Sequence, residues 1–366
     1  MRDFSKAKRV VIKIGTNILT KNDGVDSAYV RRIAGQVFPI IQGGKEILIV
    51  SSGAIGMGAG QLAPGQRAKD TKMRQACAAI GQPLLMTEYR KAFARCGIKV
   101  AQVLLTSEVL DNRKSYLNLK NAIETLLKLG AVPIINENDC VSTDEIGNAF
   151  GDNDKLSALV ASKIDADVLI ILSDIDALYD KDPKKNKDAK AIHTVFEITK
   201  DIERCAGGAG SIHATGGMKT KIEAAKIASN AGCRLVLANG RTKDVIKKIL
   251  AGETIGTIFM PKRKLSNRAR WILNSKSAGV INIDDGAIAA VRMKKSLLPG
   301  GIISVKGNFQ AGAVIKLNDM AKAVTNLGSA ELRKVAGKHS REIKNLIGGQ
   351  CREEIAVHED IVLIEY

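Results

Sequence analysis

The chain has 366 residues, of which 45% are hydrophobic and 26% are charged. This length exceeds what one ordinary hydrophobic core uses, so we expect two domains, and the near-average apolar content is typical of a globular protein. No run of 18 or more apolar residues occurs, which argues against a membrane-spanning helix.

The formal net charge is +18 at pH 7. A basic balance of this size fits binding of nucleic acid, binding of an anionic substrate, or a host whose proteins are generally basic. Charge alone does not choose between these three explanations.

Cysteine and histidine usage predicts neither disulfides nor a structural metal site. The six cysteines are spread along the chain without a C-x-x-C pair, and the four histidines lack the spacing of zinc ligands. The charged stretch from Met1 to Arg9 leads straight into a short apolar strand and lacks the pattern of a signal peptide. We therefore predict a cytoplasmic protein with reduced thiols.

Short apolar runs alternate with amphipathic stretches over the first 250 residues or so. The predicted strands are Arg9–Ile14, Glu46–Val50, Lys99–Leu105, Val132–Asn136, Val168–Leu172 and Arg234–Ala238. The predicted helices are Ser27–Ile41, Lys72–Cys96, Lys114–Leu129, Asn153–Lys163, Lys219–Ala231 and Thr242–Ala251. This alternation predicts an α/β fold with a mainly parallel central sheet flanked by helices on both faces, and ligands at the carboxyl ends of the strands.

The pattern changes near Pro261, where a charged stretch is followed by short runs rich in turn residues. The runs that we interpret as strands are Gly279–Ile283, Ala287–Arg292, Gly301–Val305, Ala313–Leu317, Ile355–His358 and Ile361–Tyr366. We therefore predict an α/β domain over residues 1–260, a linker over 261–275 and a small β-rich domain over 276–366.

Two segments that follow strands could bind anions. Lys13 stands near the end of an apolar strand, where a lysine is costly unless an anion meets it. An edge-strand lysine that reaches solvent is the alternative. The small residues of Ser51–Gly60 would let backbone N–H groups approach an anion. A plain turn explains this segment equally well, and neither a Walker A loop nor a G-x-G-x-x-G fingerprint is present.

Two further segments concentrate carboxylates and amides. Ile135–Asp139 follows a strand, and Gly151–Lys155 precedes a helix. Such groups can hold an ammonium, orient lysines or lie near a metal. The alternative for Gly151–Lys155 is helix capping, because Asp and Asn are preferred N-cap residues.

The last two segments point to a polyphosphate. Leu172–Tyr179 follows a strand and contains Ser173 and Asp174. Thr215–Lys221 opens a helix and combines glycines, a hydroxyl and two lysines. Glycine-freed backbone at a helix N-terminus together with lysines suits phosphate binding, and a purely structural loop is the alternative.

Taken in order, these segments resemble the amino acid kinase family, and within it the branch that phosphorylates the side-chain carboxylate of free glutamate. The resemblance covers nearly the whole chain. The segments Ser296–Ile302 and Val305–Phe309 make the tail similar to a PUA domain. The resemblance implies ATP as phosphoryl donor, Mg²⁺ brought with ATP, a product that begins proline synthesis, inhibition by proline, and a homo-oligomer (dimer or tetramer).

The resemblance also implies site residues. Three residues are expected to be catalytic: Lys13, Asp154 and Lys221. The residues expected to bind glutamate are Ser52, Gly53, Asp139, Asp152 and Asn153. Those expected to bind ATP are Lys13, Ser173, Asp174, Thr215, Gly216, Gly217, Met218, Lys219, Thr220 and Lys221. No direct protein ligand of a metal is expected.

Two alternative functions stay open on the sequence. Another member of the same family would accept acetylglutamate, aspartate or a nucleoside monophosphate. An RNA-binding protein would use the basic charge and the PUA-like tail, but only 4% of the residues are aromatic, so platforms for base stacking are scarce.

Overall fold

The computed structural model describes residues 2–21, 24–62, 70–141, 153–183, 185–206, 217–262, 264–339, 342, 346 and 353–364. The chain divides into two compact units, Met1–Lys264 and Leu265–Tyr366. No helix among the described residues is long and apolar enough to cross a membrane.

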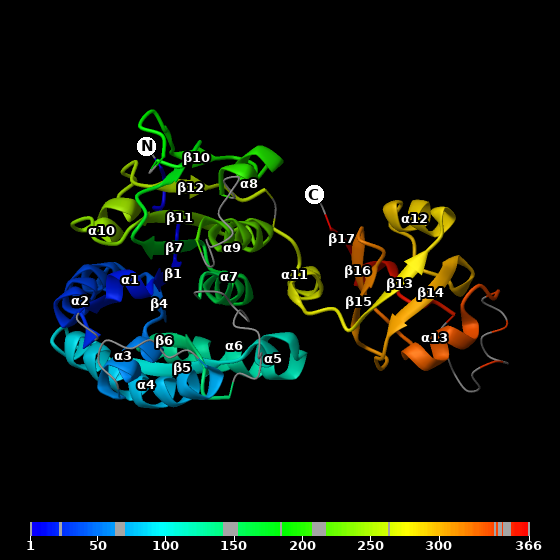
Figure 1. Ribbon diagram of the computed structural model, residues 1–366, viewed down its shortest axis with the longest axis horizontal. Coiled ribbons are helices and arrows are strands. Elements are labelled where there is room, and N and C mark those ends of the chain that lie inside the picture. Colours follow the sequence, from blue (N-terminus) through cyan, green and yellow to red (C-terminus); the bar gives the residue numbers. More distant parts are fainter. Residues whose placement is uncertain are drawn as a thin grey trace. The chain divides into compact units, whose positions relative to one another are not determined.

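The first unit is built on one large sheet (Figure 1), with strand order β10-β12-β11-β7-β1-β4-β6-β5. Its strands are β1 (Arg9–Ile14), β4 (Glu46–Ser51), β5 (Val100–Leu105), β6 (Val132–Glu137), β7 (Val168–Ser173), β10 (Thr194–Val195), β11 (Arg234–Asn239) and β12 (Thr257–Phe259). All neighbouring pairs are parallel except β11 and β12. The predicted mainly parallel sheet is confirmed.

Helices cover both faces of this sheet. One face packs β1, β4, β7 and β11 against α2 (Ser27–Gln42), α4 (Thr71–Ala94) and α10 (Val245–Leu250). The other packs the alternate residues of the same strands against α6 (Arg113–Lys128), α7 (Asp154–Lys163) and α9 (Met218–Asn230). Because side chains alternate along a strand, Ile12 faces the first core and Val11 the second. The central strands are therefore buried on both sides, as their continuous apolar runs indicate.

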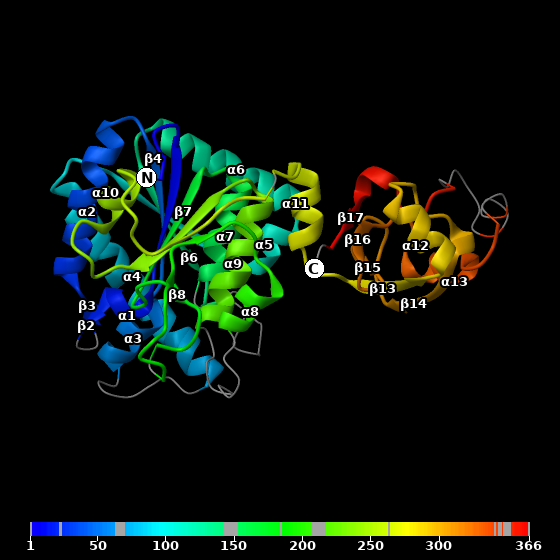
Figure 2. The same cartoon turned by 90° about the horizontal axis from the view of Figure 1, so that it is seen from above.

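Short elements gather at the carboxyl ends of the central strands. Figure 2 shows α1 (Thr16–Leu19), which follows β1, and α3 (Ala54–Leu62), which follows β4, at the same edge of the sheet. The remaining elements of this unit are β2 (Thr20–Lys21), β3 (Gly24–Val25), α5 (Ser107–Asp111), β8 (Leu178–Tyr179), β9 (Ala191–Ile192) and α8 (Lys200–Ala206). This edge is where an open parallel sheet places its ligands.

The described residues of the second unit form a small sheet with three helices and two 3₁₀ turns. Its strand order is β14-β13-β15-β16-β17. The elements are α11 (Asn267–Asn274), β13 (Gly279–Ile283), α12 (Asp285–Arg292), η1 (Pro299–Gly301), β14 (Ile302–Gly307), β15 (Val314–Leu317), β16 (Ala321–Val324), α13 (Ser329–Val335), η3 (His358–Asp360) and β17 (Ile361–Leu363). The prediction of a small β-rich C-terminal domain is confirmed.

Two strands predicted in this unit are wrong. Ile355–His358 makes only an isolated bridge, between Ala356 and Leu297, and ends in the 3₁₀ turn η3. Residues Ala287–Arg292 form most of helix α12, not a strand. The carboxylate of Asp284 accepts a hydrogen bond from the Ala287 N–H, and Asp285 and Arg292 lie in the first and last turns, where they favour the helix dipole. The capping signal decided the structure, whereas the short apolar run suggested a strand.

The stretch expected to be a linker contains helix α11. Ile272 of this helix is buried against Val314, Val324 and Val362 of the second unit. The Nζ of Lys322 donates to the carbonyl oxygens of Leu273 and Ser275 at 2.7 and 2.6 Å, which satisfies the end of the helix.

Candidate active site

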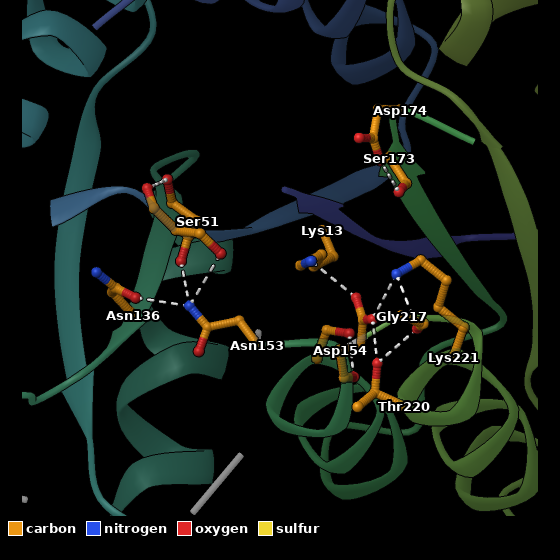
Figure 3. A network of polar contacts seen from close by, with 12 residues as sticks. Lys13, Ser51, Asn136, Asn153, Asp154, Ser173, Asp174, Gly217, Thr220 and Lys221 are labelled. Atoms are coloured by element: carbon orange, nitrogen blue, oxygen red, sulfur yellow. Dashed lines mark hydrogen bonds and ion pairs between the residues drawn. The ribbon is translucent and has the colours of Figure 1, made fainter. Parts of the chain in front are cut away.

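Two buried lysines and one buried aspartate meet behind the carboxyl ends of the central strands (Figure 3). Lys13 comes from β1, Asp154 opens α7, and Lys221 lies in the first turn of α9. The Nζ of Lys13 lies 2.8 Å from Oδ1 of Asp154, and the Nζ of Lys221 lies 3.0 Å from Oδ2. Each carboxylate oxygen therefore holds one ammonium group.

Burial makes this cluster unusual. Lys13 and Lys221 are 1% and 2% exposed, and Asp154 is fully buried. Since β1 lies in the middle of the sheet, the alternative of a solvent-reaching edge lysine is excluded. Buried ammonium groups are costly unless they meet negative charge, so a site that buries two of them beside one carboxylate is suited to an anion.

The ionised form of Asp154 is held by its two partners. Burial by itself would raise the pKa of Asp154, but the charges and hydrogen bonds of Lys13 and Lys221 outweigh it and keep the pKa below its usual value. The carboxylate therefore stays charged at neutral pH and fixes both ammonium groups in place.

The start of helix α9 adds polar groups to the cluster. The Thr220 hydroxyl lies 3.0 Å from Oδ2 of Asp154 and 3.0 Å from the carbonyl oxygen of Gly217. The Nζ of Lys221 also donates to the Gly217 carbonyl oxygen at 3.4 Å. Because the first N–H groups of a helix are unpaired within it, this N-terminus favours an anion beside the two lysines.

A second polar network lies at the end of β4. Asn153, the residue before α7, has φ 60° and ψ 3°, a left-handed conformation that asparagine tolerates better than most residues. Its side-chain Nδ2 donates to the Ser51 carbonyl oxygen at 2.7 Å and lies 3.2 Å from the Ser52 hydroxyl. The alternative interpretation of this segment, helix capping, does not apply to the Asn153 side chain, which makes no capping hydrogen bond.

The glycine after Ser52 is required by the backbone. Gly53 has φ +97°, a conformation that side chains with a Cβ rarely adopt. This turn takes the chain from β4 into α3, and the Ser51 hydroxyl lies 3.0 Å from the hydroxyl of Tyr89. The loop is therefore held from both sides.

Asp139 lies just beyond β6, half-buried. Burial raises its pKa to about 6, although the charge of Arg74 acts in the opposite direction. No hydrogen bond or ion pair joins Asp139 to the Asn153 network among the described residues. Its carboxylate is therefore a separate acidic group whose charge changes close to neutral pH.

Ser173 ends strand β7 and Asp174 follows it, on the other side of Lys13 from Asn153 in Figure 3. The Ser173 hydroxyl donates to Oδ1 of Asp174 at 3.1 Å, and Nδ2 of Asn17 donates to Oδ2 at 2.9 Å. The hydrogen bond from Asn17 is the main cause that lowers the pKa of Asp174. Asn17 was not among the expected residues, although it follows the β1 segment that contains Lys13.

The structure thus brings together most of the residues that the sequence singled out. Three of them, Asp152, Thr215 and Gly216, lie outside the described residues. Met218 and Lys219 lie at the start of α9, and Lys219 is exposed. The sequence reasoning did not name as site residues Ser51 and Asn136, which bond to Asn153, although both lie in segments that it singled out. It missed Gln82, which bonds to Asn136. In the described part of the chain, no cluster of three His, Cys, Asp or Glu side chains could hold a metal ion.

Comparison with known proteins identifies the family. The profile of the amino acid kinase family matches residues 8–239, and that of the PUA domain matches residues 279–347. The chain belongs to the amino acid kinase family. The PUA match likewise identifies the C-terminal unit, as its sequence resemblance implied.

Curated relatives of this amino acid kinase extend over almost the whole chain. A glutamate 5-kinase from Methanosarcina acetivorans is 47% identical over 99% of this chain and 97% of its own. One from Methanosarcina barkeri is 49% identical over 98% of this chain and 97% of its own. Among solved structures, carbamate kinase from Giardia lamblia bound to AMP-PNP has 16% identity and a TM-score of 0.50, covering 70% of this chain and all of that one. The structural likeness supports the fold, and the relatives identify the branch of the family.

Proposed function

We propose that the chain transfers the γ-phosphoryl group of ATP to the side-chain carboxylate of L-glutamate, giving L-glutamyl 5-phosphate and ADP. The observation that carries this proposal is the buried Lys13–Asp154–Lys221 cluster, in which two ammonium groups are held by one carboxylate. The name shared by relatives that are 42–49% identical supports glutamate as the acceptor.

The chemistry needs charge compensation more than proton transfer. A side-chain carboxylate with an ordinary pKa of about 4.3 is already ionised at neutral pH, so it attacks the γ-phosphorus without a general base. One oxygen–phosphorus bond forms as the bond to the ADP oxygen breaks. The enzyme must therefore bring two anions together and stabilise the charge on the transferring phosphoryl group.

The buried lysines suit this task. We assign Lys13 and Lys221 to contacts with the oxygens of the transferring phosphoryl group and with the attacking and leaving oxygens on either side of it. Asp154 orients both ammonium groups without a proton of its own. The carboxylate binds each lysine through a different oxygen, so the two ammonium groups are held apart. Both can then contact oxygens of one phosphoryl group.

The nucleotide is assigned to the side of the sheet that carries Ser173 and Asp174. Its phosphates would lie along the start of α9, from Gly217 to Lys221, where helix N–H groups and lysines meet. Thr215 and Gly216, which are predicted to bind ATP, are assigned to the same phosphates. Mg²⁺, when bound with ATP, supplies further charge compensation, and we expect phosphate and water oxygens to be its main ligands.

Glutamate is assigned to the opposite side of Lys13. Ser52, Gly53 and Asn153 gather there in the structure. Asp139 and Asp152 are assigned to the substrate ammonium, which would select a free amino acid over an acylated one. This assignment deepens the resemblance to the glutamate-specific branch and is open to direct test.

A substrate panel tests the proposed function. ATP turnover is measured with glutamate, acetylglutamate, aspartate and UMP in parallel, with hydroxylamine present to trap an acyl phosphate. We expect a hydroxamate with glutamate alone. Turnover with another acceptor and none with glutamate would contradict the glutamate assignment while leaving the lysine roles intact.

Regulation and assembly are proposed from the resemblance. Proline, the end product of the pathway that this reaction would begin, is proposed to inhibit the enzyme, and initial rates that do not change over a proline titration would refute this. A cytoplasmic homo-oligomer is proposed as well, and light scattering that gives a monomer at working concentration would contradict it.

A further inference from the structure

Three buried side-chain amides form a chain between helix α4 and the start of α7. Nδ2 of Asn136 donates to Oε1 of Gln82 at 2.8 Å, and Nδ2 of Asn153 donates to Oδ1 of Asn136 at 2.8 Å. The exposed fractions of Gln82, Asn136 and Asn153 are only 8%, 2% and 8%. A buried chain of this kind keeps its geometry because each lost hydrogen bond would leave a dry polar group.

Main-chain groups indicate which way the amides of Asn136 and Asn153 face, and Gln82 supplies the remaining acceptor. The Ser51 carbonyl oxygen can only accept, so Asn153 must turn its NH₂ toward it. The Glu137 N–H can only donate, at 2.9 Å, so Asn136 must turn its oxygen toward that N–H. The backbone partners thus set the orientation of the two asparagine amides. The NH₂ group of Asn136 then donates to Oε1 of Gln82, at the α4 end of the chain.

The result is a defined polarity at Asn153. Its NH₂ is used inside the network, and its carbonyl oxygen points away from Ser51 and Asn136 (Figure 3). Asn153 makes no capping bond, and none of the described residues donates to this oxygen. An amide oxygen accepts N–H groups and repels carboxylates, so the free end of the chain suits an ammonium.

Gln82 is held firmly enough to act as the anchor. A Cβ on Gly81 would lie 1.8 Å from the Ala54 carbonyl oxygen, and one on Gly58 would lie 1.8 Å from the Cys77 carbonyl oxygen. The backbones of α3 and α4 therefore touch on both sides of this crossing. Since α3 follows the loop that contains Ser52, the position of Gln82 is tied to the substrate loop.

We propose that Gln82 is a positioning residue that, through Asn136, turns the carbonyl oxygen of Asn153 toward the α-ammonium group of the substrate. The proposal rests on the proposed function, since it assumes that the acceptor is a free amino acid. It adds a residue on α4 that selects for the amino group, at a distance from the phosphoryl chemistry.

The test removes the acceptor at the anchor. Gln82→Met keeps the size of the side chain but leaves the buried Asn136 NH₂ group without its acceptor, so Asn136 holds Asn153 less firmly. We expect the KM for glutamate to rise roughly three- to tenfold, the effect of one hydrogen bond. The kcat and the KM for ATP should stay unchanged. The inhibition constant of glutarate, which lacks the amino group, should also stay unchanged.

Matched variants separate this role from packing. Leu85→Met alters the buried face of the same helix at similar volume and should leave every constant near the wild-type value. Gln82→Glu retains an acceptor oxygen and should restore the KM for glutamate to within about twofold of wild type. If Gln82→Met does not fold, Gln82→Leu removes the acceptor in its place.

Each outcome is decisive. A KM for glutamate that Gln82→Met does not move overturns the proposal, as does an equal weakening of glutamate and glutarate. Glutamate-dependent hydroxamate formation by the wild-type enzyme is measured first. Its absence refutes the proposed function and the inference together, whereas an active wild type with an unaffected variant refutes the inference alone.

Discussion

The side chains of Asn153 and Asp154, consecutive residues at the start of α7, enter two different networks. The Asn153 amide bonds to the end of β4, and the Asp154 carboxylate binds the two buried lysines. The left-handed backbone of Asn153 makes this divergence geometrically feasible, because it turns the chain sharply just before the helix. One short segment therefore links the proposed glutamate side to the proposed phosphoryl side.

Removing either buried lysine is expected to abolish most of the turnover. Lys13→Ala and Lys221→Ala each delete a charge that stabilises the transition state, so kcat should fall by about two to three orders of magnitude. Steady-state kinetics measures this. Lys226→Ala is the control, since Lys226 lies on the same helix and makes only an exposed ion pair with Glu203. Near-normal kcat in both lysine variants would overturn their assigned roles.

Neutralising the central carboxylate is expected to cost stability as well as activity. Asp154→Asn keeps the shape but removes the carboxylate that two buried ammonium groups share, so the free energy of unfolding should fall by about 3–5 kcal/mol. Urea unfolding measures the change. Glu203→Gln, which breaks only the exposed pair with Lys226, should have a much smaller effect. A loss of unfolding free energy no greater than that of the surface control would mean that water reaches the cluster.

Acid should remove the same stabilisation. The pKa of Asp154 is lowered in the folded protein, so its contribution is complete above the ordinary pKa of an aspartate and is lost as the pH falls through the lowered value. The difference in unfolding free energy between wild type and Asp154→Asn should therefore be constant near neutrality and shrink in acid. A difference that grows on acidification would reverse the assignment of the ionised state.

Asp139 is expected to give glutamate binding a pH dependence. With a pKa of about 6, its carboxylate gains a proton as the pH falls below 6 and can then no longer attract the substrate ammonium. The kcat/KM for glutamate should decline below this pH, and Asp139→Asn should remove the inflection and raise the KM. The kcat/KM for ATP at saturating glutamate serves as the reference. An inflection that survives in Asp139→Asn must come from another group.

The C-terminal unit should lose stability when helix α11 loses its cap. Lys322→Met leaves the carbonyl oxygens of Leu273 and Ser275 without their ammonium donor, at an expected cost of about 1–2 kcal/mol. Thermal unfolding of the full chain measures this, with Lys316→Met, whose Nζ lies 3.6 Å from Oδ1 of Asp319, as the control. A stable variant would show that the apolar contact of Ile272 alone fixes the helix.

The sequence predicted the α/β unit well because each of its signals is local. Val168–Leu172 is a continuous apolar run, and the strand in the structure extends it by one residue, Ser173. In the second unit the apolar run Ala287–Arg292 was wrongly interpreted as a strand, since the N-cap at Asp284 outweighs a short apolar run. Where a local pattern and a capping signal compete, the cap was the better guide.

The site was less predictable, because its contacts join distant parts of the chain. Lys13 stood out as a charge within an apolar strand, but nothing in the local pattern pairs it with Asp154. Gln82 carries no signal at all: it lies on a helix and meets Asn136 only after folding. The resemblance to a known family supplied the pairing of the lysines, whereas the amide chain appeared only in the structure.

The place of β1 between β4 and β7 also orders events during synthesis. Lys13 leaves the ribosome early, yet its carboxylate partner is Asp154, and the second lysine follows 67 residues later. Until Asp154 has been made, the ammonium group of Lys13 lacks this carboxylate partner. The strand at the centre of the sheet is thus among the first to be translated, whereas its lysine is paired with Asp154 only after a later part of the chain has been made.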